Sequence, residues 1–266
     1  MANGKNLLEV TKLEVTYHHA VVPVQGISFH VPEGSIVAIL GVNGAGKTTV
    51  LRAISGFMGT DDAEVTDGSI IYQGEEFRNK LPYEVARRGV TLVPERDKIF
   101  ITLTVQENLA SSVPSQKADI KKMFDLIYTY FPILNQRRSQ VAGYLSGGER
   151  QMLGIARALL CFPKFLLIDE LSLGLAPIIT VSLMETISSL RKELGLTVLL
   201  VEQNAAAALH IADYGYIMEN GRVVFDDTPE KLLKHEDVRE FYLGIAAAGE
   251  KSYRDVKQYR RVRRWW

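Results

Sequence analysis

The sequence has a single cysteine, no long apolar run and no net charge. Cys161 is the only cysteine in 266 residues, so an internal disulfide is impossible and a reducing compartment is expected. No stretch reaches the roughly 18 apolar residues of a membrane-spanning helix, and the opening residues lack the apolar core of a signal peptide. Basic and acidic residues number 31 each. This balance predicts no whole-chain attraction to nucleic acid or lipid.

What the chain does have is an alternation of strand and helix patterns. Residues 7–17 and 27–31 alternate apolar and polar side chains, as half-buried antiparallel strands do. Near-continuous apolar runs predict strands that are buried on both faces. These runs are residues 35–40, 90–93, 164–168 and 197–202, and helical spacing at residues 48–55 and 179–194 separates some of them. Strand–helix–strand order of this kind implies a parallel sheet covered by helices.

Helical spacing also dominates between residues 103 and 160. We predict helices at 105–110, 120–131 and 149–160, with breaks at Pro114 and Pro132. The predicted organisation is a core of residues 1–95 and 157–245, a helical insert of residues 96–156 and a tail of residues 246–266. A polar, turn-rich stretch at 59–68 is expected to be a loop before a hairpin-like segment at 69–74. Two closing strands are expected within residues 213–226.

A glycine-rich loop follows the buried strand at 35–40. It matches the phosphate-binding pattern G-x-x-x-x-G-K-[ST] at every position. The glycines let several backbone N–H groups point at one anion, and the following helix adds the positive end of its dipole. A plain glycine turn is the simpler alternative, but the strand before it favours nucleotide binding. The residues assigned to the nucleotide are Gly41, Asn43, Gly44, Ala45, Gly46, Lys47, Thr48 and Thr49, with Lys47 placed at the β- and γ-phosphates.

Two carboxylates, Asp169 and Glu170, end the apolar run that begins at residue 164. The carboxyl ends of parallel strands are where such sheets bind ligands. One acid can hold Mg²⁺ and the other can orient or deprotonate the attacking water. We assign Asp169, with the Thr48 hydroxyl, to the metal and Glu170 to the water. Two solvated acids at a strand end would be the alternative if the phosphate loop were absent.

A second glycine-led helix start lies in LSGGERQ, residues 145–151. Ser146 suits an N-cap, and Gly147 and Gly148 leave backbone N–H groups open to an anion. Alone this could be an ordinary capped helix. Together with the phosphate loop it resembles the signature of the ATP-binding cassette family. The resemblance implies a head-to-tail dimer in which residues 146–148 of one subunit touch the γ-phosphate held by the other.

The resemblance extends from about residue 8 to residue 243. It implies an α/β P-loop NTPase core with an antiparallel β portion and an inserted helical subdomain. It also implies Mg²⁺-ATP as the ligand, an aromatic at Tyr17 that stacks on adenine, and a groove near residues 95–104 that receives a short partner helix.

Four positions depart from the commonest family pattern. Glu95 replaces a glutamine that reaches the metal, Leu171 a proline, Leu175 an aspartate and Gln203 a histidine that contacts the γ-phosphate. Glu95, Leu175 and Gln203 occur in segments similar to the F-type ATP-binding subunits of branched-chain amino acid importers, and Leu171 is unusual even there. Glu95 can ligate Mg²⁺ directly, and Gln203 can donate an amide hydrogen bond but carries no charge. The catalytic set is therefore Glu170, Lys47 and Gln203, with Glu95 joining the metal ligands.

This resemblance implies several partners. They are separate transmembrane permease subunits, a second ATPase subunit that is identical or of a sister type, and, indirectly, an external solute-binding protein. The chain would then sit peripherally on the cytoplasmic face of the inner membrane, without nucleic acid. The tail carries seven basic residues against two acidic ones over residues 250–266, with Tyr and Trp between them. That composition suits an anionic membrane surface, although RNA or plain solvation is also compatible with it.

Two other classes stay open from the sequence alone. One is a soluble, non-transport ATPase of the same family that acts on ribosomes or DNA, but such proteins usually carry two cassettes or a long coiled-coil insertion. The other is a regulatory module that binds nucleotide with weak hydrolysis. Its support is the combination of Glu95, Leu175 and Gln203.

Overall fold

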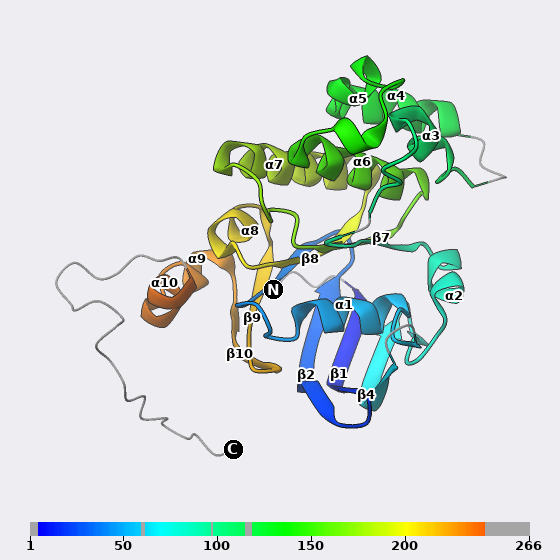
Figure 1. Ribbon diagram of the computed structural model, residues 1–266. Helices are drawn as coiled ribbons and strands as arrows, with labels where there is room; N and C mark the ends of the chain where they lie inside the picture. Colours follow the sequence, from blue (N-terminus) through cyan, green and yellow to red (C-terminus); the bar gives the residue numbers. More distant parts are fainter. Residues whose placement is uncertain (1–4, 60–61, 97, 115–118, 243–266) are drawn as a thin grey trace.

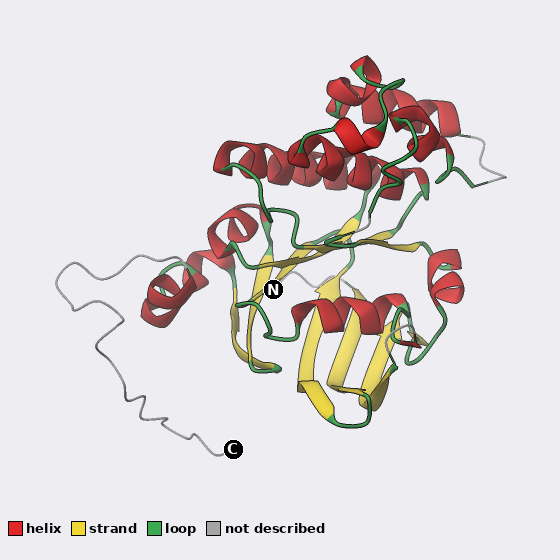
Figure 2. Cartoon of the chain, in the orientation of Figure 1, coloured by secondary structure: helices red, strands yellow, loops and turns green. Residues whose placement is uncertain are grey.

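The computed structural model describes residues 5–59, 62–96, 98–114 and 119–242 of the chain. The predicted tail, residues 246–266, lies outside the described residues. Within the described ranges no helix is both long enough and apolar enough to cross a membrane. The elements form two sheets with helices between and above them (Figures 1 and 2).

The larger sheet carries the buried strands. Its order is β10-β9-β3-β8-β7-β6, and all neighbours are parallel except β10 and β9. The predicted parallel sheet is therefore confirmed. Its strands are β3 (Ile36–Leu40), β6 (Val90–Val93), β7 (Phe165–Asp169), β8 (Thr197–Glu202), β9 (Tyr214–Glu219) and β10 (Arg222–Asp227).

The smaller sheet is antiparallel and has the order β2-β1-β4-β5. It consists of β1 (Asn6–Tyr17), β2 (Val21–Pro32), β4 (Ala63–Tyr72) and β5 (Glu75–Glu76). The expected loop at residues 59–68 is wrong from Ala63 onward, because β4 begins there. The polar stretch pairs with β1 despite its composition, and the register shifts between Thr11 and Glu14 opposite Ser69 and Asp67. Gly68 (φ 82°) lies in this irregular stretch.

Helix α1 (Lys47–Ser55) packs against strands of both sheets, and Figure 1 shows it between them. Alternate residues of the larger sheet supply two cores. Val37 and Ile39 of β3 face α1 and the antiparallel sheet, whereas Ile36, Ala38 and Leu40 face the opposite layer of helices. Burial on both faces explains the continuous apolar run of β3. The short helix α2 (Pro82–Arg87) precedes β6.

The helical insert lies between β6 and β7 in the chain. It contains α3 (Val105–Ala110), α4 (Ile120–Tyr130), α5 (Pro132–Gln136), the 3-10 helix η2 (Ala142–Tyr144) and α6 (Gly147–Leu160). The predicted break at Pro132 is the first residue of α5, where proline is favoured because its missing N–H needs no partner. The insert limits of 96 and 156 stay a prediction.

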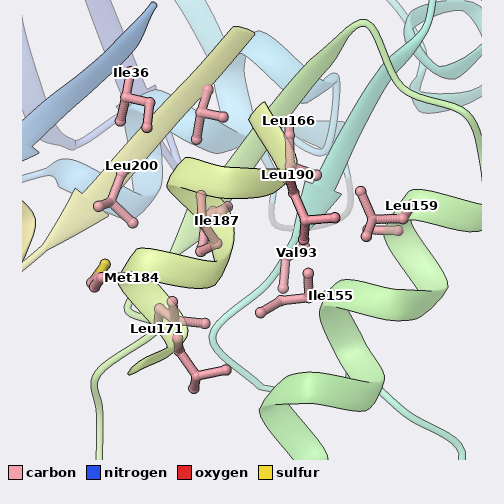
Figure 3. Close-up of a cluster of buried hydrophobic side chains, with 14 of the residues drawn as sticks. Ile36, Val93, Ile155, Leu159, Leu166, Leu171, Met184, Ile187, Leu190 and Leu200 are labelled. Atoms are coloured by element: carbon pink, nitrogen blue, oxygen red, sulfur yellow. The ribbon is translucent and has the colours of Figure 1, made fainter. Parts of the chain in front are cut away.

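The remaining helices cover the outer face of the larger sheet and its far edge. They are α7 (Pro177–Leu194), α8 (Ala205–Ile211), α9 (Pro229–Leu232) and α10 (Glu236–Tyr242). Figure 3 shows how Met184, Ile187 and Leu190 of α7 pack onto the sheet, with Leu171 and residues of α6 beside them. This core fixes the position of the segment that follows β7.

Candidate nucleotide-binding site

The phosphate loop connects β3 to α1 and passes close to other backbone. Gly46 has φ 100°, and a Cβ there would lie 2.5 Å from the Pro23 carbonyl oxygen. A Cβ on Gly41 would lie 2.5 Å from the Met218 carbonyl oxygen. Glycine is therefore required at both positions for steric reasons. No side chain caps the start of α1, so its first N–H groups suit an anion such as a phosphate.

An open cavity of about 430 Å³ lies beside this loop. It brings together sequence-predicted residues from the phosphate loop, from the segment after β6 and from the end of β7. Its lining residues are Pro23, Asn43, Gly44, Gly46, Lys47, Thr48, Thr49, Glu95, Arg96, Glu170 and Leu173. Most of the predicted nucleotide residues therefore share one cavity with the predicted catalytic glutamate.

Lys47 is the charged centre of the site. Its Nζ lies 2.9 Å from Oε1 of Glu170 and donates to the Gly41 carbonyl oxygen at 2.8 Å and to that of Val42 at 3.2 Å. The Lys47 side chain is 4% exposed. A buried ammonium held at the loop is placed to meet phosphate oxygens.

The predicted metal ligands come from three segments: Thr48 from α1, Asp169 from the end of β7 and Glu95 from the chain after β6. Thr48 Oγ1 donates to Asp169 Oδ1 at 3.1 Å, and Glu95 lines the same cavity. The pKa of Asp169 is raised to about 6, mainly by burial; the charges of Glu170 and Glu95 contribute to the rise, whereas Thr48 and Lys47 oppose it. A cation at this position would offset the mutual repulsion of the carboxylates. One hydroxyl and two carboxylates are the oxygen donors that Mg²⁺ takes beside a nucleotide, so these residues fit the ion.

Glu170 follows β7 and adopts an uncommon backbone conformation. Its φ is 48°, a left-handed value that costs a non-glycine residue roughly 1–2 kcal/mol. Its amide donates to the Val201 carbonyl oxygen at 2.9 Å. Strain of this kind persists where the surroundings fix it, and it occurs often at active sites.

The signature residues lie at a second cavity of about 410 Å³. Ser146 caps α6 with a reciprocal box, in which its amide donates to Glu149 Oε2 at 2.8 Å and its hydroxyl accepts from the Glu149 amide at 3.4 Å. Gly147 and Gly148 line this cavity with Leu175 and Ile179. One chain thus carries two separate glycine-led helix starts.

Apart from the signature residues, five predicted positions do not line the first cavity: Gly41, Asp169, Tyr17, Gln203 and Ala45. Tyr17 is half-buried at the end of β1 and packs on the core beside the antiparallel sheet. Gln203 is exposed directly after β8. Ala45 is buried within the loop. Their assigned contacts with the nucleotide or the metal stay predictions.

Sequence reasoning missed other residues around the site. Pro23, Arg96 and Leu173 line the cavity, but no local motif marks them. The carboxyl of Glu202, at the end of β8, is buried and bonded to Ser172. That pair is distant in sequence, so only the fold reveals it.

Comparison with known proteins now decides the family. A family model described as "ABC transporter" matches residues 24–172, which include the phosphate loop, the signature and the two carboxylates. The high-affinity branched-chain amino acid transport ATP-binding protein BraG of Pseudomonas aeruginosa is 45% identical over 230 residues, covering 86% of this chain and 96% of BraG. The chain belongs to the ABC transporter family. It is an ABC-type ATPase, and the resemblance inferred from its motifs is confirmed.

Two further relatives agree with this assignment. The probable branched-chain amino acid transport ATP-binding protein LivF of Archaeoglobus fulgidus is 35% identical, covering 90% of this chain and 99% of LivF. A crystal structure of an ABC transporter ATP-binding cassette in its ADP conformation is 25% identical and superimposes with a TM-score of 0.78, covering 91% of this chain and all of that one. The expected α/β cassette fold is confirmed. Since the named relatives serve transporters, the ribosome- or DNA-acting alternative is not favoured.

Proposed function

We propose that this ABC-type ATPase drives the uptake of branched-chain amino acids through a membrane-spanning permease. The observation that carries hydrolysis is the cavity at the phosphate loop that Lys47, Thr48 and Glu170 share, with Asp169 hydrogen-bonded to Thr48. The solute class is proposed from BraG and LivF, which match this chain over nearly their whole length.

Each residue of the cavity has a defined task in this proposal. The loop amides and Lys47 bind the β- and γ-phosphates, and Glu170 accepts a proton from the attacking water. Thr48, Asp169 and Glu95 would hold Mg²⁺, which would neutralise phosphate charge. Ser146, Gly147 and Gly148 of a second subunit would close over the γ-phosphate. Gln203 would add an amide donor, and Tyr17 would stack on adenine.

The partners follow from the same proposal. Permease subunits would dock near residues 95–104, where Phe100 is 50% and Ile101 60% exposed, since such exposed apolar side chains suit a protein contact. The second ATPase subunit would be an identical or sister chain, and an external solute-binding protein would deliver the amino acid. The chain would then lie peripherally on the cytoplasmic face of the membrane.

A transport assay tests the solute class. Uptake of labelled leucine and of labelled glutamate is measured in cells that lack this chain and are supplied with either the wild type or Glu170→Gln. We expect wild type to restore leucine uptake alone and Glu170→Gln to restore neither. Leucine uptake that is unchanged by loss of the chain would rule out the proposed solute.

A second assay tests hydrolysis directly. Purified wild type should release phosphate from Mg²⁺-ATP. Glu170→Gln should bind ATP but release no phosphate from it. Equal, slow release by both proteins would instead favour a regulatory module.

A further inference from the structure

Glu202 is a fully buried acid that the hydrolytic mechanism above does not use. It is the last residue of β8 and is 0% exposed. Its Oε1 accepts from the Ser172 amide at 2.8 Å, and its Oε2 accepts from the Ser172 hydroxyl at 2.5 Å. Both hydrogen bonds end on the carboxyl group, and they are stronger than bonds between neutral groups when that group is ionised. A buried carboxylate is costly, so this pair needs an explanation.

The position of Glu202 connects two parts of the site. Its strand lies between β3 and β7 in the sheet. Its main-chain carbonyl accepts from the Gly41 amide at 3.3 Å, where the phosphate loop begins. Its side chain holds Ser172, two residues after Glu170. One residue therefore touches both the phosphate loop and the segment that carries the proposed catalytic acid.

The segment after β7 is fixed at three consecutive positions. The Glu170 amide is bonded to Val201, Leu171 is 0% exposed in the core shown in Figure 3, and Ser172 is bonded to Glu202. Glu170 itself is held at φ 48° between these contacts. A non-glycine residue keeps this conformation only where its surroundings enforce it, and the Ser172 bonds supply the enforcement on its C-terminal side.

We propose that Glu202 and Ser172 form a clamp that positions Glu170 for ATP hydrolysis. The inference rests on the proposed catalytic role of Glu170. Glu202 and Ser172 are positioning residues, since they act through the backbone of Glu170. The charged groups that face Glu202 are the Glu170 carboxylate and the Lys98 ammonium, and neither contributes a hydrogen bond to the clamp.

The first test removes only the Ser172 hydroxyl. Ser172→Ala should lower kcat for ATP hydrolysis about tenfold, which is the loss expected when one charge-assisted hydrogen bond is removed. The KM for ATP should change by less than about twofold. Ser172→Thr keeps the hydroxyl and should retain most of kcat. The matched control is Ser189→Ala on α7, whose exposed hydroxyl bonds only a backbone carbonyl among the described contacts, and it should leave kcat unchanged.

The second test removes the charge at the other end of the clamp. Glu202→Gln cannot accept two hydrogen bonds through equivalent oxygens, so kcat should again fall with KM retained. The double variant with Ser172→Ala should be no slower than the slower single variant, because both changes break one unit. A double variant whose losses multiply would overturn the clamp.

Other outcomes are equally decisive. The inference would be overturned if Ser172→Ala kept the wild-type kcat, even with a lower melting temperature. It would also be overturned if Ser172→Thr lost as much of kcat as Ser172→Ala. Glu170→Gln is measured beside these variants. If it hydrolyses ATP like wild type, the proposed catalytic assignment fails; if it is inactive while Ser172→Ala is not, only the clamp fails.

Discussion

The Lys47 ammonium and the Glu170 carboxylate form an ion pair of 2.9 Å, with side chains 4% and 8% exposed. The cation that a triphosphate needs is thus paired with the acid proposed to act on water. Binding of the phosphates must then compete with Glu170 for Lys47. The cost of breaking a desolvated pair is large when one partner is left alone.

This pairing predicts the nucleotide affinity of Glu170→Gln. The variant keeps the shape of the side chain but removes its charge, so Lys47 becomes more available and ATP should bind about five- to tenfold tighter, or about 1 kcal/mol. The comparison is Glu64→Gln, which removes an exposed carboxylate that forms an ion pair of 3.8 Å with His19. Titration with a fluorescent ATP analogue measures both. Unchanged or weaker binding in Glu170→Gln would contradict the competition.

The phosphate loop predicts a difference between two glycine substitutions. Gly46→Ala must displace backbone, since its Cβ would meet the Pro23 carbonyl oxygen at 2.5 Å. Gly26 also has a positive φ, of 73°, but a Cβ there meets nothing within 4 Å. We expect Gly26→Ala to lose only the conformational term of about 1–2 kcal/mol and to bind ATP normally. Gly46→Ala should lose more stability and ATP binding as well, as seen by thermal unfolding with and without ATP; equal behaviour would contradict the close approach.

Two helices of the insert, α6 and α3, begin with matched caps. Ser146 and Thr104 each form a reciprocal capping box, with Glu149 and Glu107 respectively. Alanine at either position should cost about 1 kcal/mol of stability. If Ser146 also touches a γ-phosphate, only Ser146→Ala should in addition lower phosphate release by the purified ATPase. Equal losses of activity in the two variants would show that Ser146 only caps its helix and does not contact the γ-phosphate.

The buried Glu202 predicts a pH dependence of stability. Burial raises its pKa from 4.5 to about 7, partly countered by the bonds from Ser172. The folded state therefore holds the Glu202 proton more tightly than the unfolded state. Its contribution to stability is full below about pH 4.5 and is lost as the pH rises through about 7.

Glu202→Gln stays neutral at every pH, so its stability does not fall for this reason. From pH 5 to pH 8, its free energy of unfolding should rise relative to that of wild type by on the order of 2 kcal/mol, as measured by urea unfolding. A constant difference across this range would contradict the raised pKa. A variant that is more stable at pH 8 yet slower in hydrolysis would separate positioning from folding.

The parts of the fold that depend on local sequence patterns could be predicted from the sequence. The apolar runs of β6 and β8 and the helical spacing of α3 were correctly bounded, because both-face burial and amphipathic spacing are visible in a short window. The phosphate loop was equally clear, since its glycines are fixed by steric contact. Helix α8 was missed: four consecutive alanines follow its cap, Asn204, and give no amphipathic pattern.

Other features depend on contacts between distant residues. Ala63 and its polar neighbours form β4 because β1 supplies a hydrogen-bonding partner, not because their composition favours a strand. Leu171 looked anomalous beside Glu170 in the sequence, whereas the structure gives it a place in the core against α7. The bond between Ser172 and Glu202 joins residues 30 apart in the chain. No local pattern could reveal it.

Mixed dimers test the central claim, which is that one nucleotide is bound by the phosphate loop of one subunit and by the signature residues of another. Lys47→Ala disables the first element and Ser146→Arg the second, so each variant alone should release almost no phosphate. Because a mixed dimer contains one undamaged composite site, an equimolar mixture should regain a clear fraction of wild-type phosphate release. A mixture of folded variants that stays as inactive as its components would show that each chain completes its own site.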